Sequence, residues 1–257
     1  MAAVIRIGVN LLPEHTSVGA LRRAWRAADA LGVDSLWIWD HFFPVTGDPD
    51  GTSFECWSLL AAMAADTTRP TVGSLVSACA YRNPDLLTDM ARTVDHVSGG
   101  RAVLGIGAGW MERDYAAYGY AFASDGQRLA ALEGALVRIR ARLPELRPGP
   151  VGPLPILVGG SGERVTLRLV AQYADAWNFI GTLEDFARKS AVLDGWAATV
   201  GRDPSAIERS ISVFAEEHPL PLESYRAAGV DHVIRSVRDP FDLDDVADLL
   251  RQREELR

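Results

Sequence analysis

The sequence predicts an α/β fold, a single (β/α)8 barrel of the TIM type with eight parallel strands. Short β-branched runs alternate with longer amphipathic runs eight times along the chain. The chain has 257 residues, and a barrel of this type typically needs about 250, so one barrel would use the whole chain. No charge shift or flexible linker divides the sequence. We therefore expect one domain over residues 1–257.

Eight segments are predicted to form strands because each is a short, nearly continuous apolar run, which is typical of parallel strands buried on both faces. The first strand leads into NLLPEHTSVG, which lacks the GxGxxG pattern that a doubly wound dinucleotide-binding sheet carries at this point. We therefore favour the closed barrel over the doubly wound sheet. The predicted strands cover residues 5–11, 35–40, 71–77, 102–109, 155–160, 176–180, 209–214 and 232–237.

Amphipathic segments between the strands are predicted to form helices. The segments 18–32 and 84–100 both end on glycine, the residue preferred just past the last helical turn. Further helices are expected to begin at Thr182, whose first turn holds two acidic residues, and at Asp242. The proline-rich segment 142–155 cannot continue a helix, so it is predicted to be an extended connector into the fifth strand.

Composition and charge exclude several classes of protein. The net charge is −8 without a basic footprint, so we expect no nucleic-acid partner. Lys189 is the only lysine and lies in a helical pattern, which argues against pyridoxal-phosphate enzymes and P-loop NTPases. Cys56 and Cys79 lack metal-ligand spacing, so we expect buried thiols and no metal site. No run of about 18 apolar residues and no secretion signal is visible, which predicts a cytoplasmic protein without a membrane partner.

The catalytic face of such a barrel is formed by the C-terminal ends of the strands and the loops that follow them. The second strand ends in WIWDHFFP, which places Asp40 and His41 at this face. A histidine there is able to move a proton near neutral pH. The alternative is that Asp40 caps the following segment and that His41 is a packing residue at the rim.

The fifth strand is followed by GGSGE (159–163) and then by a helical pattern. Glycines let a ligand approach the backbone, and the free N–H groups of a helix N-terminus favour an anion. An ordinary glycine-rich turn is the alternative. Aromatic residues near the rim suit a planar, largely apolar ligand. The apolar walls are expected to come from Phe42, Phe43, Trp110 and Trp177.

Five motifs in a fixed order resemble the luciferase-like monooxygenase superfamily, and most closely its deazaflavin (F420)-dependent oxidoreductases. The motifs are WIWDHFFP, VGSLVSACAYRNP, SGGRAVLGIGAGW, PILVGGSGE and YADAWN. The resemblance covers about positions 5–215, and the order and spacing of the motifs make it specific. It implies a (β/α)8 barrel that binds FMN or the deazaflavin coenzyme F420 at the C-terminal ends of the strands.

The resemblance also implies roles for individual residues. His41 matches a histidine that faces the reactive ring as a proton donor or polariser, and Asp40 matches an aspartate that contacts the coenzyme. Leu75, Val76 and Ser77 match a strand segment in which a non-proline cis peptide forms a bulge behind the coenzyme ring. The remaining coenzyme contacts that it implies are Ala108 and Gly109, through their backbone, and the phosphate-cradling turn of Gly159, Gly160, Ser161 and Gly162.

The sequence departs from the family's pattern in two places. Trp110 stands where the sugar-phosphate dehydrogenase branch has a catalytic glutamate, which argues against that branch's chemistry. Glu112 and Asp114 lie nearby and are interpreted as first-turn carboxylates that stabilise a helix dipole. Many relatives have an insertion before the fifth strand that helps to cover the site, whereas here only the connector 142–155 remains. We therefore expect an open pocket, or one partly covered by a dimer partner.

The first functional hypothesis is an oxidoreductase in which hydride passes between coenzyme F420 and a small organic substrate. The second keeps the fold but uses FMN and oxygen, as a two-component monooxygenase fed by a separate reductase. The third is a flavin-binding protein without turnover. The segment 54–66 and the helix from Pro84 are more apolar than a solvent-facing barrel helix needs, and relatives dimerise through this side, so we expect a homodimer.

Overall fold

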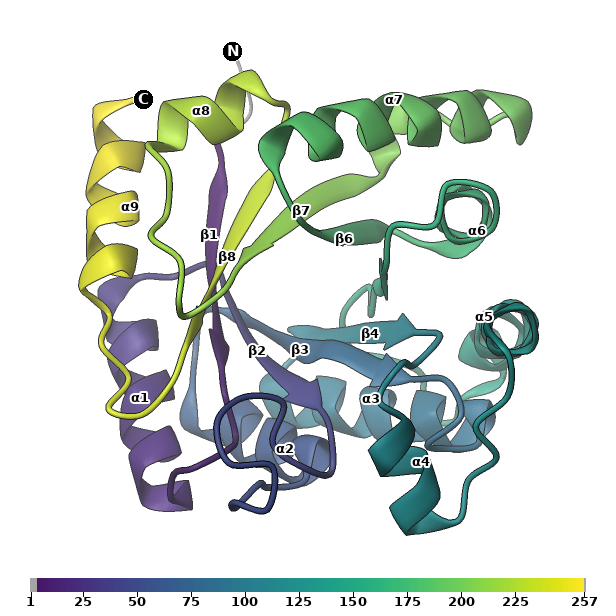
Figure 1. The fold of residues 1–257 in the computed structure, drawn as a ribbon, viewed down its shortest axis with the longest axis horizontal. Coiled ribbons are helices and arrows are strands. Elements are labelled where there is room, and N and C mark those ends of the chain that lie inside the picture. The colour runs from purple at the N-terminus through teal and green to yellow at the C-terminus, as the bar shows by residue number, and fades with distance from the viewer. Residues whose placement is uncertain (1–3, 257) are drawn as a thin grey trace.

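The computed structural model describes residues 4–256, and its strands close into an eight-stranded barrel. Each strand pairs in parallel with the next one along the chain, and β8 pairs with β1 to close the ring. The helices surround the strands on the outside (Figure 1). The predicted (β/α)8 barrel is confirmed.

Strands and helices alternate along the chain, except that α4 and α5 both follow β4. The strands are β1 (Arg6–Leu11), β2 (Ser35–Asp40), β3 (Thr71–Ala78), β4 (Ala102–Gly107), β5 (Ile156–Gly159), β6 (Ala176–Ile180), β7 (Glu208–Val213) and β8 (His232–Val237). The helices are α1 (Val18–Leu31), α2 (Cys56–Asp66), α3 (Pro84–Ser98), α4 (Glu112–Tyr118), α5 (Asp125–Arg142), α6 (Thr166–Tyr173), α7 (Leu183–Thr199), α8 (Leu222–Ala227) and α9 (Asp244–Glu255).

Local sequence signals account for most of the helix ends. Ser17 precedes α1, and its side chain accepts a hydrogen bond from a backbone N–H of the first turn. Gly32 follows α1 with φ +93°, a left-handed conformation that glycine adopts without strain. Thr182 caps α7 in the predicted place. The predicted helix start at Asp242 is wrong, because its side chain instead accepts a hydrogen bond from the N–H of Asp244, where α9 begins.

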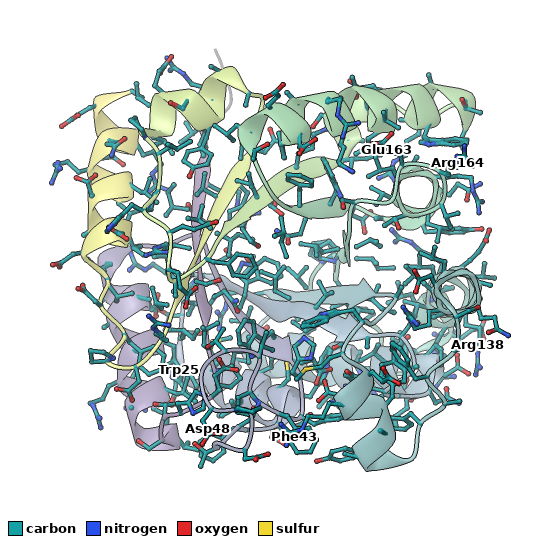
Figure 2. The ribbon with its side chains drawn as sticks, viewed as in Figure 1. Trp25, Phe43, Asp48, Arg138, Glu163 and Arg164 are labelled. Atoms are coloured by element: carbon teal, nitrogen blue, oxygen red, sulfur yellow. The ribbon has the colours of Figure 1, made fainter. Side chains whose placement is uncertain are left out.

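The strands are buried on both faces, as their continuous apolar runs predicted. Outward-facing side chains such as Ile7 and Leu36 belong to the core beneath the helices, whereas Trp37 packs inside the barrel. Side chains fill both the interior and the layer between strands and helices (Figure 2). At Gly73, a Cβ atom would lie 2.7 Å from the Trp37 ring, so the interior has no room for a larger residue there.

A polar network closes the barrel at the N-terminal ends of the strands. The His232 ring is fully buried, with Nδ1 2.9 Å from Glu208 Oε1 and Nε2 2.8 Å from Ser35 Oγ. Arg6 pairs with Glu208 at 2.5 Å. Burial disfavours the charged form of Glu208, but His232 and Arg6 outweigh it and lower the pKa of Glu208 to about 2. Burial also lowers the pKa of His232, so a neutral imidazole faces a carboxylate.

The proline-rich connector, residues 142–155, lies at the same N-terminal end of the barrel. The buried carboxylate of Asp95 accepts hydrogen bonds from the backbone N–H groups of Val151 at 2.7 Å and Gly152 at 2.9 Å. Nε2 of His96 lies 2.8 Å from a carbonyl oxygen of the connector. We expected this segment to influence how open the site is, and that expectation was wrong. A segment that enters a strand arrives at its N-terminal end, which is opposite the catalytic face.

The described residues contain neither a membrane-spanning helix nor a metal-binding cluster. Within residues 4–256, no helix is long and apolar enough to cross a membrane. Over the same residues, no group of three or more His, Cys, Asp or Glu side chains is placed to hold a metal ion. Cys56 and Cys79 are both buried and free, and burial raises the pKa of Cys79 to about 11. That thiol therefore stays protonated at neutral pH.

Candidate active site

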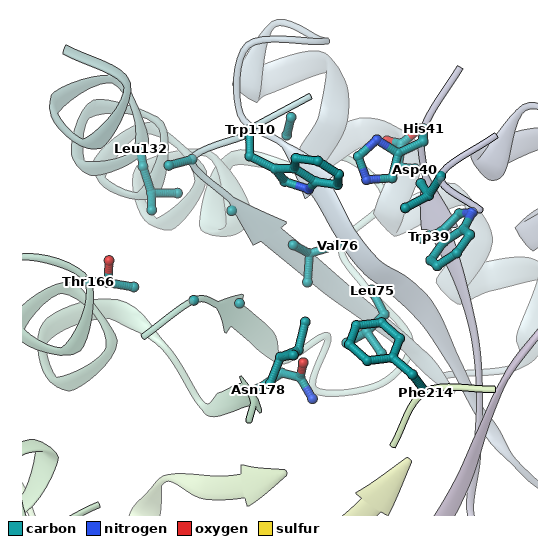
Figure 3. A pocket seen from close by; sticks show the side chains of 18 residues that line it. Trp39, Asp40, His41, Leu75, Val76, Trp110, Leu132, Thr166, Asn178 and Phe214 are labelled. Atoms are coloured by element: carbon teal, nitrogen blue, oxygen red, sulfur yellow. The ribbon is translucent and has the colours of Figure 1, made fainter. Parts of the chain in front are cut away.

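A pocket of about 380 Å³ opens at the C-terminal ends of the strands. Figure 3 shows His41 and Trp110 on one side of this pocket and Thr166 on the opposite side. The lining is largely apolar, with few polar side chains. It consists of Trp39, Asp40, His41, Val45, Leu75, Val76, Ala78, Gly107, Ala108, Gly109, Trp110, Leu132, Gly159, Gly160, Thr166, Asn178, Ile180 and Phe214.

His41 follows β2 directly, and its imidazole is held between two indole rings. The ring centroid lies 6.1 Å from that of Trp39 and 5.4 Å from that of Trp110, both in edge-to-face arrangements. Nδ1 lies 2.8 Å from Oδ2 of Asp114, in α4. Only 12% of the His41 side chain is exposed. The imidazole therefore lines the pocket in a position fixed by its neighbours.

Asp114 is a fully buried carboxylate that receives three hydrogen bonds. Besides His41, it accepts from the Tyr81 hydroxyl at 2.7 Å and from the backbone N–H of Phe42 at 3.2 Å. Burial and the neighbouring carboxylate raise the pKa of Tyr81 far above its usual value. The phenol therefore stays protonated and donates a hydrogen bond to Asp114. Because a carboxylate only accepts, His41 donates from Nδ1, which leaves Nε2 for a partner in the pocket.

The interpretation of Asp114 as a helix-dipole residue alone is wrong. It does lie in the first turn of α4, but its carboxylate contacts residues that are 73 and 33 positions earlier in the chain. The sequence did offer one signal: His41, Tyr81 and Asp114 follow the C-terminal ends of β2, β3 and β4, which are neighbours in the barrel. Residues that follow neighbouring parallel strands meet at the same rim.

Asp40 lies at the edge of the pocket with its charge already paired. Its carboxylate is almost fully buried and forms a salt bridge with Arg82, which follows β3. Nη2 of Arg82 also lies 2.6 Å from Glu55, the residue before α2. Asp40 therefore contributes a neutralised group to the lining, while its arginine partner lies behind it.

The floor of the pocket is built from β3, β4 and β5. The peptide bond between Leu75 and Val76 is cis, as the resemblance implied, and the strand register shifts on both sides of β3 there. Val76 leaves no room for side chains opposite it: a Cβ atom at Gly107 would lie 2.9 Å away, and one at Gly159 3.0 Å. At Gly109, with φ +80°, a Cβ atom would clash with a buried tyrosine hydroxyl. The floor is thus apolar and free of projecting side chains at these glycines, which fits a planar ring.

The glycine-rich turn lies at the other end of the pocket, where only its first two glycines face the cavity. Gly160 has φ +129° and lines the pocket together with Thr166, the first residue of α6. Gly162 is exposed, and the carbonyl of Ser161 accepts a hydrogen bond from Lys189 at 2.7 Å. Thr166 was not among the predicted contacts, although it opens the helix that the turn was expected to precede.

Eight of the predicted site residues line the pocket and three do not. Ser77 is fully buried in β3, and its Oγ accepts a hydrogen bond from Trp57 Nε1 at 3.0 Å, away from the cavity. Ser161 and Gly162 are not part of the lining. The predicted residues that line the pocket are Asp40, His41, Leu75, Val76, Ala108, Gly109, Gly159 and Gly160.

Of the four aromatic residues expected to form apolar walls, only Trp110 lines the pocket. Trp177 is fully buried on the outer face of β6, where it stacks 5.5 Å from a phenylalanine of α7. Its neighbour Asn178 lines the pocket, and successive residues of a strand point to opposite faces. Phe42 and Phe43 turn away from the cavity and pack against tyrosine rings and an arginine.

Comparison with known proteins places the chain in one family. Residues 1–218 match the family described as luciferase-like monooxygenase. An uncharacterized protein of Mycobacterium tuberculosis is 28% identical over 246 residues, which cover 89% of this chain and 81% of that protein. The phthiodiolone/phenolphthiodiolone dimycocerosates ketoreductase of the same organism is 30% identical over 225 residues, which cover 72% of this chain and 58% of the ketoreductase.

Solved structures share the fold at low sequence identity. An F420-dependent secondary alcohol dehydrogenase, solved with an F420–acetone adduct, has a TM-score of 0.86 at 17% identity and covers 97% of this chain and 99% of its own. The oxygenating constituent of 3,6-diketocamphane monooxygenase from Pseudomonas putida, solved with FMN, has a TM-score of 0.64 at 17% identity and covers 84% of this chain and 68% of its own. Because the family model matches most of the sequence, residues 1–218, the chain belongs to the luciferase-like monooxygenase family.

Proposed function

We propose that the protein is an oxidoreductase that transfers a hydride between coenzyme F420 and a small organic substrate. The observation that carries this proposal is the His41–Asp114 pair, which presents one imidazole nitrogen to a pocket with an apolar, glycine-lined floor. When bound, the deazaflavin coenzyme supplies the hydride chemistry, and the protein supplies binding, orientation and a proton.

The extent of the structural matches supports F420 rather than FMN. The F420-dependent secondary alcohol dehydrogenase is matched over 99% of its chain, and the coenzyme F420 dependent tetrahydromethanopterin reductase of Methanopyrus kandleri over 98%. The FMN-bound monooxygenase is matched over 68% of its chain. This chain therefore matches nearly the whole length of the two F420-dependent enzymes, but only about two thirds of the FMN-bound monooxygenase.

Residues of the floor and of the glycine-rich turn would hold the coenzyme. Val76 and the backbone of Gly109 and Gly159 leave an apolar surface that a ring is able to approach closely. At the other end of the pocket, Thr166 begins α6. The N–H of Leu167 already donates to the carbonyl of Gly162, and the remaining first-turn N–H groups suit a phosphate. Gly160 beside it has a left-handed backbone without a side chain, so that a phosphate has room to reach those groups.

His41 would hold and move the proton that accompanies the hydride. Asp114 occupies Nδ1, so exchange with the substrate takes place at Nε2, on the pocket side. The buried Asp114 also keeps the ring from rotating, which preserves the geometry between turnovers. Trp39 and Trp110 on either side of the ring limit the access of water.

Binding titrations with F420 and with FMN, followed by absorbance, test the proposal. We expect saturable binding of F420, tighter than that of FMN, and a substrate-dependent change in its redox state without oxygen consumption. Tight binding of FMN with oxygen consumption by the reduced enzyme would identify a two-component monooxygenase instead. Binding of F420 without turnover of any alcohol or carbonyl compound would identify a binding protein.

A further inference from the structure

We propose that Lys189 is a positioning residue for the coenzyme, because it holds the glycine-rich turn in the form that receives a phosphate. This inference rests on the function proposed above. Lys189 is the only lysine of the sequence and lies in α7, which packs beside α6 outside the strands (Figure 1). Its side chain is not part of the pocket lining, so it would act on the coenzyme through the backbone of the turn.

Each carbonyl group of the turn, from residue 160 to residue 163, accepts a hydrogen bond. The carbonyl of Ser161 accepts from Lys189 Nζ at 2.7 Å. The carbonyl of Glu163 accepts from Nε1 of Trp196, also in α7, at 2.7 Å. The other two accept from an indole N–H of β6 at 2.7 Å and from the second residue of α6 at 3.0 Å. Carbonyl oxygens repel an anion, and here they are engaged by donors outside the pocket lining.

The N–H groups of the same peptides point the opposite way. In a planar trans peptide the C=O and N–H bonds are antiparallel, so a carbonyl drawn toward α7 turns the next N–H away from α7. The N–H of Gly162 follows the carbonyl held by Lys189, and that of Arg164 follows the carbonyl held by Trp196. Within the described part of the chain, the N–H groups of residues 161–165 have no hydrogen-bond partner. Successive unpaired N–H groups form a concavity that binds anions.

The side chain of Lys189 is packed into this turn rather than extended into solvent. Only 15% of it is exposed, and Nζ lies 3.5 Å from the carboxylate of Glu163 in addition to its contact with the carbonyl. All other basic side chains of the sequence, histidines apart, are arginines. A compact ammonium group fits beside a single carbonyl, whereas a guanidinium group is broad and planar. Lysine therefore suits a place where one carbonyl is held inside a packed turn.

The neighbouring Arg188 provides a natural comparison. It belongs to the same helix and is 52% exposed. Its guanidinium group pairs with the side chains of Glu163 and Asp185, and in the described residues it bonds no carbonyl of the turn. Substitution of Arg188 therefore removes a positive charge near the turn without releasing the backbone. Substitution of Lys189 removes the same charge and releases the carbonyl of Ser161 as well.

Binding titrations test the proposal by comparing F420 with the matching deazariboflavin, which has the ring and the ribityl chain but no phosphate. Lys189→Met should weaken binding of F420 by about tenfold and leave binding of the phosphate-free compound unchanged. Trp196→Phe keeps an aromatic ring but removes the donor to the Glu163 carbonyl, so it should weaken F420 binding with the same selectivity. Arg188→Met is the control and should leave both affinities unchanged.

Three results would overturn the positioning role: wild-type affinity for F420 in Lys189→Met, equal weakening of both compounds, or an equal loss of F420 affinity in Arg188→Met. The last would assign the effect to charge alone. If Lys189→Met does not fold, Lys189→Gln makes the same comparison, because its amide ends one bond short of the ammonium group.

Failure of the proposed function gives a different result. A wild-type protein that binds FMN but not F420 would overturn the proposed function alone. The variants are then compared with FMN and riboflavin, which also differ by a phosphate, and the same selective loss in Lys189→Met would support the positioning role. A wild-type protein that binds neither F420 nor FMN would overturn both proposals.

Discussion

The imidazole of His41 is fixed at one nitrogen and free at the other, and this asymmetry sets what the pocket is able to do. Asp114 holds Nδ1, while Tyr81 and a backbone N–H hold Asp114 in turn. Hydrogen bonds to a charged group contribute about 1.5–3 kcal/mol each, so the same contacts also stabilise the fold. Substitutions at these positions therefore need readouts that separate turnover from stability.

We predict that His41→Ala slows turnover by roughly 10²–10⁴-fold, because the proton donor is lost. The affinity for coenzyme should change much less, since the floor and the glycine-rich turn remain. His41→Asn should recover part of the activity if hydrogen bonding is the main role, and little if proton transfer is essential. Steady-state kinetics and coenzyme titration measure the two effects. Near-normal turnover with a lowered Tm would show that His41 is a packing residue.

Asp114→Asn should lower kcat by roughly 10²-fold or more, because an amide that donates to Nδ1 selects the wrong tautomer of His41. Coenzyme affinity should stay close to that of the wild type. The tautomer is read directly from the ¹⁵N signals of His41 by NMR. Tyr81→Phe is the matched control: it removes one hydrogen bond to Asp114 but leaves the carboxylate and its contact with His41. A lowered Tm with unchanged kcat and tautomer would contradict the positioning role.

At the scale of elements, the two ends of the pocket come from different parts of the barrel. The loops after β2 and β4 supply the imidazole and its partners, whereas β5 and α6 supply the glycine-rich end. Between them, β3 contributes the cis peptide and Val76, which the glycines of β4 and β5 accommodate. Under the proposed function, coenzyme binding and proton transfer would depend on separate elements, so we expect mutations to separate them.

Gly160→Val should weaken coenzyme binding by about tenfold or more. The glycine has φ +129°, which a β-branched residue rarely adopts, and the added side chain would meet Thr166 at the pocket end. Ser161→Ala is the control, because this side chain lies outside the lining. Coenzyme titration of both variants checks the prediction. Wild-type affinity in Gly160→Val would move the phosphate site elsewhere.

At the scale of the whole molecule, the polar network at the N-terminal end of the barrel makes stability depend on pH. The pKa values of Glu208 and His232 are both lowered in the folded protein, so the unfolded chain binds their protons more readily. The free energy of unfolding should therefore decrease as the pH is lowered. The His232 contribution declines below the usual value of 6.5, and the Glu208 contribution declines between 4.5 and about 2.

Thermal unfolding measured across this pH range checks the prediction. Glu208→Gln should flatten the decline of Tm below pH 4.5, because the group that takes up the proton is gone. Glu223→Gln changes an exposed carboxylate of α8 and should leave the decline as it is. An equally steep decline in Glu208→Gln would assign the acid sensitivity to other groups.

Assembly is the second property of the whole molecule. A groove of about 330 Å³ lies between α2 and α3, and its lining includes Trp57, Ala61, Leu86 and Met90. Leu86 is 55% exposed there, on the side of the barrel that the sequence predicts as a dimer face. We expect a homodimer in sedimentation velocity at micromolar concentration. Leu86→Asp should dissociate it, whereas Val200→Asp, after α7, should not; a monomeric wild type would reject the dimer.

The sequence by itself determined the strands, several helix ends and the position of His41 at the C-terminal ends of the strands. The caps at Ser17, Gly32 and Thr182 depend on contacts within one helical turn, so local residue types specify them. The continuous apolar strands and the repeated alternation specify the barrel, and the barrel places His41 at the catalytic face. These inferences succeeded because each depends on a local period or on a property that all such barrels share.

Only the tertiary structure decided which side chains meet. Asp114 reaches His41 across 73 positions, and Arg82 neutralises Asp40 across 42. Such contacts depend on how neighbouring βα loops pack against one another, which no local period encodes. Trp177 shows the same limit within one strand: its type suits a pocket wall, but the strand's alternation places its neighbour Asn178 in the pocket and turns the indole toward α7. Residue type predicts what a side chain can contact, whereas strand register and loop packing determine what it does contact.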